Sequence, residues 1–180
     1  MNLPNKLTIL RICMIPPFLF FLYCSFGGGA NNWIAFAIFL AASLTDMFDG
    51  KIARKYNLIT NFGKFMDPLA DKLLVDSALI ALCELGRIQG WIVIIIIARE
   101  FIISGFRLVA ADKGTVIAAG WWGKAKTVAQ MGAVILLIID FKNTPMWVIT
   151  QILVYVSLAL TVISLVDYLM KNKNVISDIK

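Results

Sequence analysis

Four aspartates with regular spacing stand inside a largely apolar stretch of the sequence. Asp46 and Asp49 are three residues apart, and Asp67 and Asp71 are four residues apart. Both spacings put the paired carboxylates on one face of a helix. A carboxylate in such apolar surroundings is costly, and intramembrane acids are functional by default. The alternative, in which they form ion pairs with nearby lysines and arginines, is disfavoured because four aspartates align on two matched faces.

Small and basic residues continue these two helical faces. Gly50, Ala53 and Arg54 follow the first aspartate pair, and Gly63 precedes the second. The eight residues between Arg54 and Gly63 predict a turn, so the two faces can meet. At a rise of ~1.5 Å per residue, all four carboxylates reach a similar depth. We expect one shared pocket, in which the small side chains admit a ligand and Arg54 contacts a phosphate oxygen.

The aspartates predict a metal site. Four carboxylates within a few ångströms cannot all ionise without a cation. The chain contains no histidine, and its three cysteines lie outside the motif, so hard oxygen ligands favour Mg²⁺ or Mn²⁺ over Zn²⁺. Two carboxylate pairs could hold two metal ions. In phosphoryl transfer, two such ions stabilise the attacking oxygen and the leaving oxygen. The absence of histidine also excludes Ser-His and Cys-His catalysis.

The composition indicates an all-α integral membrane protein. The 180 residues are 60% hydrophobic and 16% charged, with a mean hydropathy of +0.83. A bilayer core of ~30 Å needs ~20 helical residues. Short connections separate the apolar stretches, so we expect a single domain over residues 1–180. The predicted transmembrane helices are six: 7–26, 33–54, 63–85, 91–112, 121–141 and 145–170.

The distribution of basic residues predicts the orientation. With both termini cytoplasmic, only Arg87 and Lys142 of the 17 lysines and arginines lie outside. This is a strong positive-inside bias, and it opens the aspartate pocket to the cytoplasm. The basic residues are spread over helix ends without interleaved aromatics, which argues against nucleic-acid binding. We expect a multi-pass protein of the cytoplasmic membrane.

The stretch from Asp46 to Asp71 reads D-x2-D-G-x2-A-R-x8-G-x3-D-x3-D. This pattern resembles the signature of the CDP-alcohol phosphotransferase family, with every fixed position present. The chain length, the six predicted spans and their topology are also similar to that family. The resemblance therefore covers essentially the whole chain.

The resemblance implies a metal-dependent membrane enzyme that is usually a homodimer. Such enzymes join an alcohol to the phosphatidyl group of a CDP-linked lipid and release CMP, without a covalent enzyme intermediate. The resemblance assigns two metal ions to the four aspartates, and it makes Asp71 the base that deprotonates the acceptor hydroxyl. It also lines the CDP site with Gly50, Ala53, Arg54 and Gly63.

Further segments are similar to the bacterial members of the family that use CDP-diacylglycerol as donor and glycerol 3-phosphate as acceptor. These segments are NLPNKLTILR, GKFMDPLADKLL, AREFIISGFRL and WWGKAKT. They add Asn5 and Thr8 to the CDP-lipid site. Glycerol 3-phosphate is dianionic near neutral pH, so its pocket needs additional cations. The candidate cations are Arg107, Lys124, Arg99, Lys126 and Arg11.

Alternatives remain open at this point. Arg99 could pair with its neighbour Glu100, and the side chains of Arg107, Lys124 and Lys126 could snorkel to lipid headgroups. A sibling enzyme with another phosphorylated acceptor, such as inositol phosphate, would need a similar cationic pocket. A cation-coupled transporter is the rival from another class. It is disfavoured because the sequence has no obvious inverted repeat and no matching acids in its second half.

Overall fold

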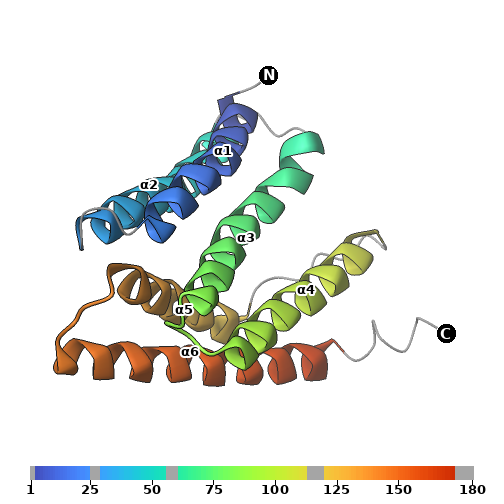
Figure 1. Ribbon diagram of the computed structural model, residues 1–180. Helices are drawn as coiled ribbons and strands as arrows, with labels where there is room; N and C mark the ends of the chain where they lie inside the picture. The colour runs from blue at the N-terminus through green and yellow to red at the C-terminus, as the bar shows by residue number, and fades with distance from the viewer. Residues whose placement is uncertain (1–2, 25–28, 56–60, 113–119, 173–180) are drawn as a thin grey trace. The chain divides into compact units, whose positions relative to one another are not determined.

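The structure is a computed structural model that describes residues 3–24, 29–55, 61–112 and 120–172. Within these ranges it describes the backbone alone for residues 3–7, 46–55, 61–68, 71 and 111–112. The described residues form helices and no strand, which confirms the all-α prediction, and each predicted span overlaps one helix (Figure 1). The helices are α1 (Leu3–Tyr23), α2 (Ala30–Lys55), α3 (Asn61–Glu84), α4 (Gly90–Asp112), α5 (Trp121–Ile139) and α6 (Thr144–Lys171).

The chain divides into two compact units. The first unit comprises Met1–Arg87 together with Leu137–Asp140, and therefore holds α1, α2, α3 and the last turn of α5. The second unit comprises Ile88–Leu136 and Phe141–Lys180, and holds α4, most of α5 and α6.

In the first unit, α1 packs against both α2 and α3. The rings of Phe18 and Phe39 are fully buried between α1 and α2, with centroids 5.6 Å apart. At the ends of α1 and α3, the Tyr23 hydroxyl donates a hydrogen bond of 2.6 Å to the Glu84 carboxylate. Because these two carboxyl-terminal ends meet, α1 and α3 run in the same direction. Helix α2, which lies between them in the sequence, runs in the opposite direction.

An arginine ties three helix ends together within the first unit. Arg87 follows α3, and its guanidinium donates to the carbonyls of Leu137 at 3.0 Å and Ile138 at 2.9 Å. It also contacts the side chains of Asn32 at 3.3 Å and Asp140 at 3.5 Å. The last carbonyls of a helix lack intrahelical partners, so Arg87 caps α5. The start of α2 and the ends of α3 and α5 therefore lie together.

In the second unit, α4 and α6 contact each other over part of their length. Arg99 lies against Ser164, and further along both helices Arg107 lies over Tyr168. Residue numbers rise together along this contact, so α4 and α6 run in the same sense.

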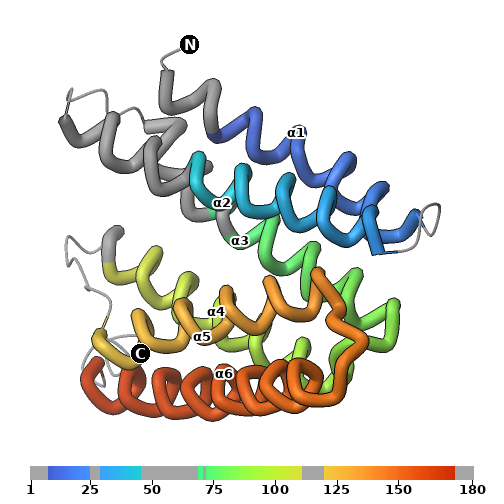
Figure 2. The backbone as a smooth tube through the Cα atoms, turned by 90° about the vertical axis from the view of Figure 1, so that its left-hand side faces the viewer, coloured from blue at the N-terminus to red at the C-terminus, as the bar shows by residue number. Residues whose placement is uncertain are grey.

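Helix α5 runs opposite to α6 (Figure 1, Figure 2). A Cβ atom built on Gly120, just before α5, would lie 3.6 Å from the Asp167 carboxylate. Twelve residues later, a Cβ on Gly132 would lie only 3.0 Å from Leu153 Cδ2. The absence of a side chain at Gly132 therefore permits the close approach of the two helices.

Helix α6 has its polar face inside and its apolar face outside. Its buried residues are Thr150, Val154, Ser157, Thr161, Ser164 and Tyr168, which recur at intervals of three or four. Its exposed face carries Trp147, Ile152, Val162 and Met170, among other large apolar side chains. An amphipathic helix in a water-soluble protein shows the reverse pattern. Among the described residues, α5 and α6 are long and apolar enough to cross a membrane.

Candidate active site

The four aspartates are placed on two packed helices of the first unit. Asp46 and Asp49 lie in the carboxyl-terminal half of α2, and Asp67 and Asp71 lie in the first half of α3. Helices α2 and α3 contact each other and run in opposite directions, so both pairs are at the same end of the unit. The helical backbone gives each pair the spacing of one turn, as the sequence predicts.

The side chains of these aspartates lie outside the described part of the structure. The same holds for the other predicted CDP-site positions on α2 and α3 and for Asn5 on α1: Gly50, Ala53, Arg54, Gly63 and Asn5. The chemistry of the donor set can still be tested against a metal. All four donors are carboxylates on two helices that contact each other, a hard-oxygen set that fits Mg²⁺ or Mn²⁺.

Helix α1 presents polar side chains to the interior of the first unit. Thr8 is 0% exposed and Arg11 is 1% exposed, and they are three residues apart on one helical face. Asp76 on α3 is also buried, at 9% exposure. Burying a charged group is costly unless polar groups compensate it. The α1 face toward α2 and α3 is therefore adapted to polar contacts.

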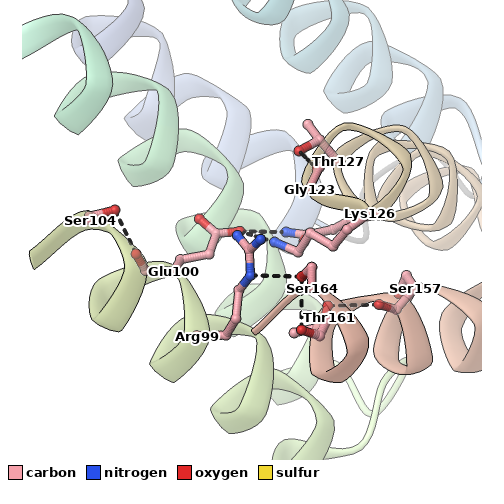
Figure 3. Close-up of polar contacts among 10 residues, drawn as sticks. Arg99, Glu100, Ser104, Gly123, Lys126, Thr127, Ser157, Thr161 and Ser164 are labelled. Carbon is pink, nitrogen blue, oxygen red and sulfur yellow. Dashed lines mark hydrogen bonds and ion pairs between the residues drawn. The ribbon is translucent and has the colours of Figure 1, made fainter. Parts of the chain in front are cut away.

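A buried ion pair joins α4 to α5 in the second unit (Figure 3). The Lys126 ammonium lies 2.5 Å from Glu100 Oε1, and the Gln130 amide donates to the same oxygen at 3.2 Å. Lys126 and Gln130 are only 2% and 3% exposed. Because a buried charge is tolerated when it is paired, this contact compensates Lys126 within the protein.

Arg99 is held by a neutral group on α6. Its Nε donates to the Ser164 hydroxyl at 3.1 Å, and that hydroxyl donates to the Thr161 carbonyl at 2.9 Å (Figure 3). A Cβ on Gly123 would lie 3.5 Å from Arg99 Nη2, so the guanidinium lies beside the first turn of α5. Adjacent residues of a helix point about 100° apart. Arg99 thus reaches α6 while Glu100 reaches α5.

Arg107 and Lys124 are exposed. The Arg107 guanidinium carbon lies 5.9 Å from the centroid of the Tyr168 ring, within the range of a cation–π contact. The ring itself is buried, at 7% exposure. Lys124 lies in the first turn of α5, the turn beside Arg99. Four of the five predicted acceptor cations therefore belong to the second unit, whereas Arg11 belongs to the first.

Comparison with known proteins identifies the family. The family model described as CDP-alcohol phosphatidyltransferase matches residues 1–163. The chain belongs to the CDP-alcohol phosphatidyltransferase family. The match includes both aspartate pairs and the cations of α4 and α5, so the sequence resemblance is confirmed.

Several curated members of the family are similar over nearly the whole chain. The CDP-diacylglycerol–glycerol-3-phosphate 3-phosphatidyltransferase of Bacillus subtilis is 44% identical over 95% of each chain. A probable phosphatidylglycerophosphate synthase of Mycobacterium tuberculosis is 43% identical over 93% of this chain and 79% of its own. The Haemophilus influenzae enzyme named as in Bacillus subtilis is 40% identical over 98% of this chain and 96% of its own.

The structure adds partners that the sequence did not assign. Glu100, Gln130, Ser164 and Tyr168 contact the candidate acceptor cations of this family member. One signal for the α6 partners is visible in the sequence. Hydroxyl side chains recur on α6 at helical intervals of three, four and seven, so they share the face that packs inward. No comparable signal links Glu100 to Lys126, because they lie on different helices.

Proposed function

We propose that the chain transfers the phosphatidyl group of CDP-diacylglycerol to the hydroxyl of sn-glycerol 3-phosphate, giving phosphatidylglycerophosphate and CMP. The observation that carries this proposal is the similarity to enzymes named for this reaction, at 37–44% identity over nearly the whole chain. The aspartate motif on α2 and α3 and the cations on α4 and α5 supply the chemistry that both substrates require.

The reaction is a direct displacement at phosphorus. The acceptor hydroxyl oxygen forms a bond to the phosphorus that carries diacylglycerol, and the bond from that phosphorus to the CMP oxygen breaks. Asp71 accepts the hydroxyl proton as general base. Asp46, Asp49, Asp67 and Asp71 would hold two Mg²⁺ or Mn²⁺ ions, which would neutralise phosphate charge and stabilise the leaving group.

The CDP-lipid site would combine the α2–α3 motif with α1. Gly50, Ala53 and Gly63 leave room for the cytidine diphosphate beside the helix backbones. Arg54 would contact a phosphate oxygen, and Asn5 and Thr8 would contribute from α1, where Arg11 is a further candidate for the acceptor phosphate. The burial of the Thr8 and Arg11 side chains supports a polar interior on this side of α1.

The acceptor site would hold the dianionic phosphate of glycerol 3-phosphate. Arg99, Arg107 and Lys124 are the direct candidates. Arg99 hydrogen-bonds to a hydroxyl and Arg107 lies over an aromatic ring, and neither partner carries a charge. Lys126 would contribute its positive charge from within the pair with Glu100. Cations held by neutral partners retain their attraction for a phosphate.

The protein would be a single catalytic domain with six transmembrane helices, both termini in the cytoplasm and the active site facing the cytoplasm of a cell membrane. The apolar outer face of α6 supports the membrane setting. Within each unit, helices that follow one another in the sequence run in opposite directions, which agrees with successive crossings of a membrane. Arg87, one of the two basic residues predicted outside, is engaged as a helix cap. We also propose a homodimer, as the family resemblance implies.

A direct assay tests the function. The protein purified in detergent would be supplied with CDP-diacylglycerol, Mg²⁺ or Mn²⁺, and one acceptor at a time, and CMP release would be measured. We expect release with glycerol 3-phosphate and little with inositol phosphate, choline or ethanolamine. Preferential release with inositol phosphate would reassign the acceptor, and no release with any acceptor would overturn the enzymatic proposal.

Cysteine labelling tests the orientation. In a variant lacking the three native cysteines, Gly29→Cys and Leu58→Cys would each be exposed to a membrane-impermeant maleimide outside intact cells. A Cβ at Gly29 meets no atom within 4 Å, so a side chain fits there. We expect labelling of position 29 and protection of position 58. The reverse result would overturn the orientation and the cytoplasmic site together.

A further inference from the structure

We propose that α6 positions the acceptor site: Ser164 sets the direction of the Arg99 guanidinium, and the Tyr168 ring supports Arg107. This inference rests on the proposed function, in which these arginines bind the phosphate of glycerol 3-phosphate. Ser164 and Tyr168 are four residues apart, so both lie on the buried face of α6 that contacts α4.

A hydrogen bond within α6 fixes the orientation of the Ser164 hydroxyl independently of Arg99. Ser164 is 3% exposed, and its hydroxyl hydrogen is directed to the Thr161 carbonyl at 2.9 Å. An oxygen lone pair then accepts the Arg99 Nε–H at 3.1 Å. This contact uses the single N–H of Nε. The edge formed by Nη1 and Nη2, which can bind two phosphate oxygens at once, faces away from Ser164.

Neutral partners orient an arginine without cancelling its charge. The adjacent Glu100 pairs with Lys126, which shows that a carboxylate partner was available to this part of the fold. A carboxylate on Arg99 would compete with the substrate phosphate for the guanidinium. A hydroxyl accepts one hydrogen bond and adds no further negative charge beside the guanidinium, which the Glu100 carboxylate already attracts electrostatically.

The Tyr168 ring would act on Arg107 in the same way. Arg107 is exposed, and an exposed arginine loses rotamer entropy when it binds a ligand. The face of a buried aromatic ring at 5.9 Å restricts the guanidinium by a cation–π contact. Arg107 therefore loses less side-chain entropy when glycerol 3-phosphate binds, because its side chain is already partly ordered.

Ser164→Ala tests the first contact, with Ser157→Ala as its matched control. Ser157 is 1% exposed on the same face of α6, and its hydroxyl likewise donates to its own backbone, at 2.8 Å to the Val154 carbonyl. We expect Ser164→Ala to raise the KM for glycerol 3-phosphate about three- to tenfold, the range of one ordinary hydrogen bond, because Ser164 orients Arg99 and does not touch the substrate. Its kcat and its KM for CDP-diacylglycerol should stay within twofold, and Ser157→Ala should match the wild type.

The pair of variants at Arg99 and Ser164 separates positioning from structure. If Ser164 acts through Arg99, Ser164→Ala should add nothing to the KM in an Arg99→Ala background. An equal additional loss in that background, or an unchanged KM for Ser164→Ala alone, would overturn the positioning role. An unchanged KM for Arg99→Ala would instead refute the acceptor role of Arg99. A wild type inactive with glycerol 3-phosphate would refute the proposed function itself.

Two substitutions at Tyr168 test the second contact. Tyr168→Phe keeps the ring and should retain the wild-type KM for glycerol 3-phosphate. Tyr168→Leu removes the ring face and should raise that KM about threefold or more, at unchanged thermal stability in detergent. A raised KM for Tyr168→Phe, or equal KM values for Phe and Leu in folded protein, would overturn the role of the ring.

Discussion

Arg87 in the first unit and Arg99 in the second unit are held in opposite ways. Arg87 donates to two helix carbonyls and to Asn32, and the Asp140 carboxylate lies 3.5 Å from its guanidinium. The hydrogen bond that the structure gives Arg99 goes to the hydroxyl of Ser164. Arg87 thus has its donors and its charge satisfied within the fold, whereas Arg99 is oriented by a hydroxyl and the Glu100 carboxylate attracts it electrostatically without a hydrogen bond among those described.

The difference separates a structural cation from a binding cation. A structural arginine satisfies its donors and its charge inside the protein, so its loss should reduce stability. A binding arginine is fixed by neutral groups, so its loss should reduce affinity for an anion. Lys126 is intermediate, because Glu100 compensates its charge, and we therefore expect it to contribute less to phosphate binding than Arg99 and Arg107. The following predictions test whether these two classes hold.

The largest effect is expected for a substitution that removes the proposed general base and leaves the fold intact. Asp71→Asn should lower kcat by about 10²–10⁴-fold, the usual contribution of a positioned general base, with little change in thermal stability. EDTA should abolish the activity of the wild type, and Mg²⁺ or Mn²⁺ should restore it. CMP release measures both effects. Full activity in Asp71→Asn would remove this residue from the site.

The buried pair should affect stability next most strongly. Glu100→Ala leaves the Lys126 charge buried without its partner and should destabilise the protein by about 3–5 kcal/mol. Replacing both residues by methionine should recover most of that loss, because a buried pair contributes little net stability. Thermal unfolding in detergent provides the measurement. If Glu100→Ala were as stable as the double variant, the pair would not behave as a structural tie.

The two arginines proposed to bind the acceptor should affect the affinity for glycerol 3-phosphate. Arg99→Ala and Arg107→Ala should each raise the KM for glycerol 3-phosphate roughly ten- to hundredfold, the equivalent of one charge-assisted contact. The KM for CDP-diacylglycerol should change much less. Lys142→Ala, at an exposed lysine on the predicted outer side, serves as control. Equal changes for both substrates would place these arginines in the CDP site or the fold.

The smallest effect is expected for the structural arginine. Arg87→Ala should lower the stability by about 1–2 kcal/mol, since it removes the cap from α5. Arg87→Lys should recover only part of the lost stability, because an ammonium group cannot donate to two helix carbonyls with the planar geometry of a guanidinium. The KM for glycerol 3-phosphate should remain that of the wild type. A raised KM at normal stability would break the distinction between Arg87 and Arg99.

The sequence predicts the helices well because local features set their limits. Apolar runs of bilayer length are interrupted by short polar or glycine-containing segments, and each helix begins and ends within four residues of the predicted bounds. The placement of the aspartate pairs on α2 and α3 also follows from spacing alone. A carboxylate three or four residues from another must share its helical face.

The partners of the cations could not be predicted in this way. Glu100 and Lys126 are 26 residues apart, and their contact depends on how α4 and α5 pack. Sequence proximity suggested that Arg99 pairs with Glu100. In the structure, the hydrogen bonds of Glu100 and Arg99 go to Lys126 and Ser164, because adjacent helical residues point to different neighbours, while Glu100 still attracts Arg99 electrostatically. Periodicity fixes the face of a helix but does not identify which helix it meets.

The hydroxyl groups of α6 have a consequence for biogenesis. Thr150, Ser157, Thr161 and Ser164 each donate to a backbone carbonyl of their own helix, three or four residues earlier. In hydrocarbon, polar groups that are satisfied within one segment need no second helix. If α6 spans the membrane as proposed, these four hydroxyl groups would need no partner from a second helix when α6 enters the lipid. The ammonium of Lys126 on α5, by contrast, pairs with a carboxylate of another helix, that of Glu100 on α4.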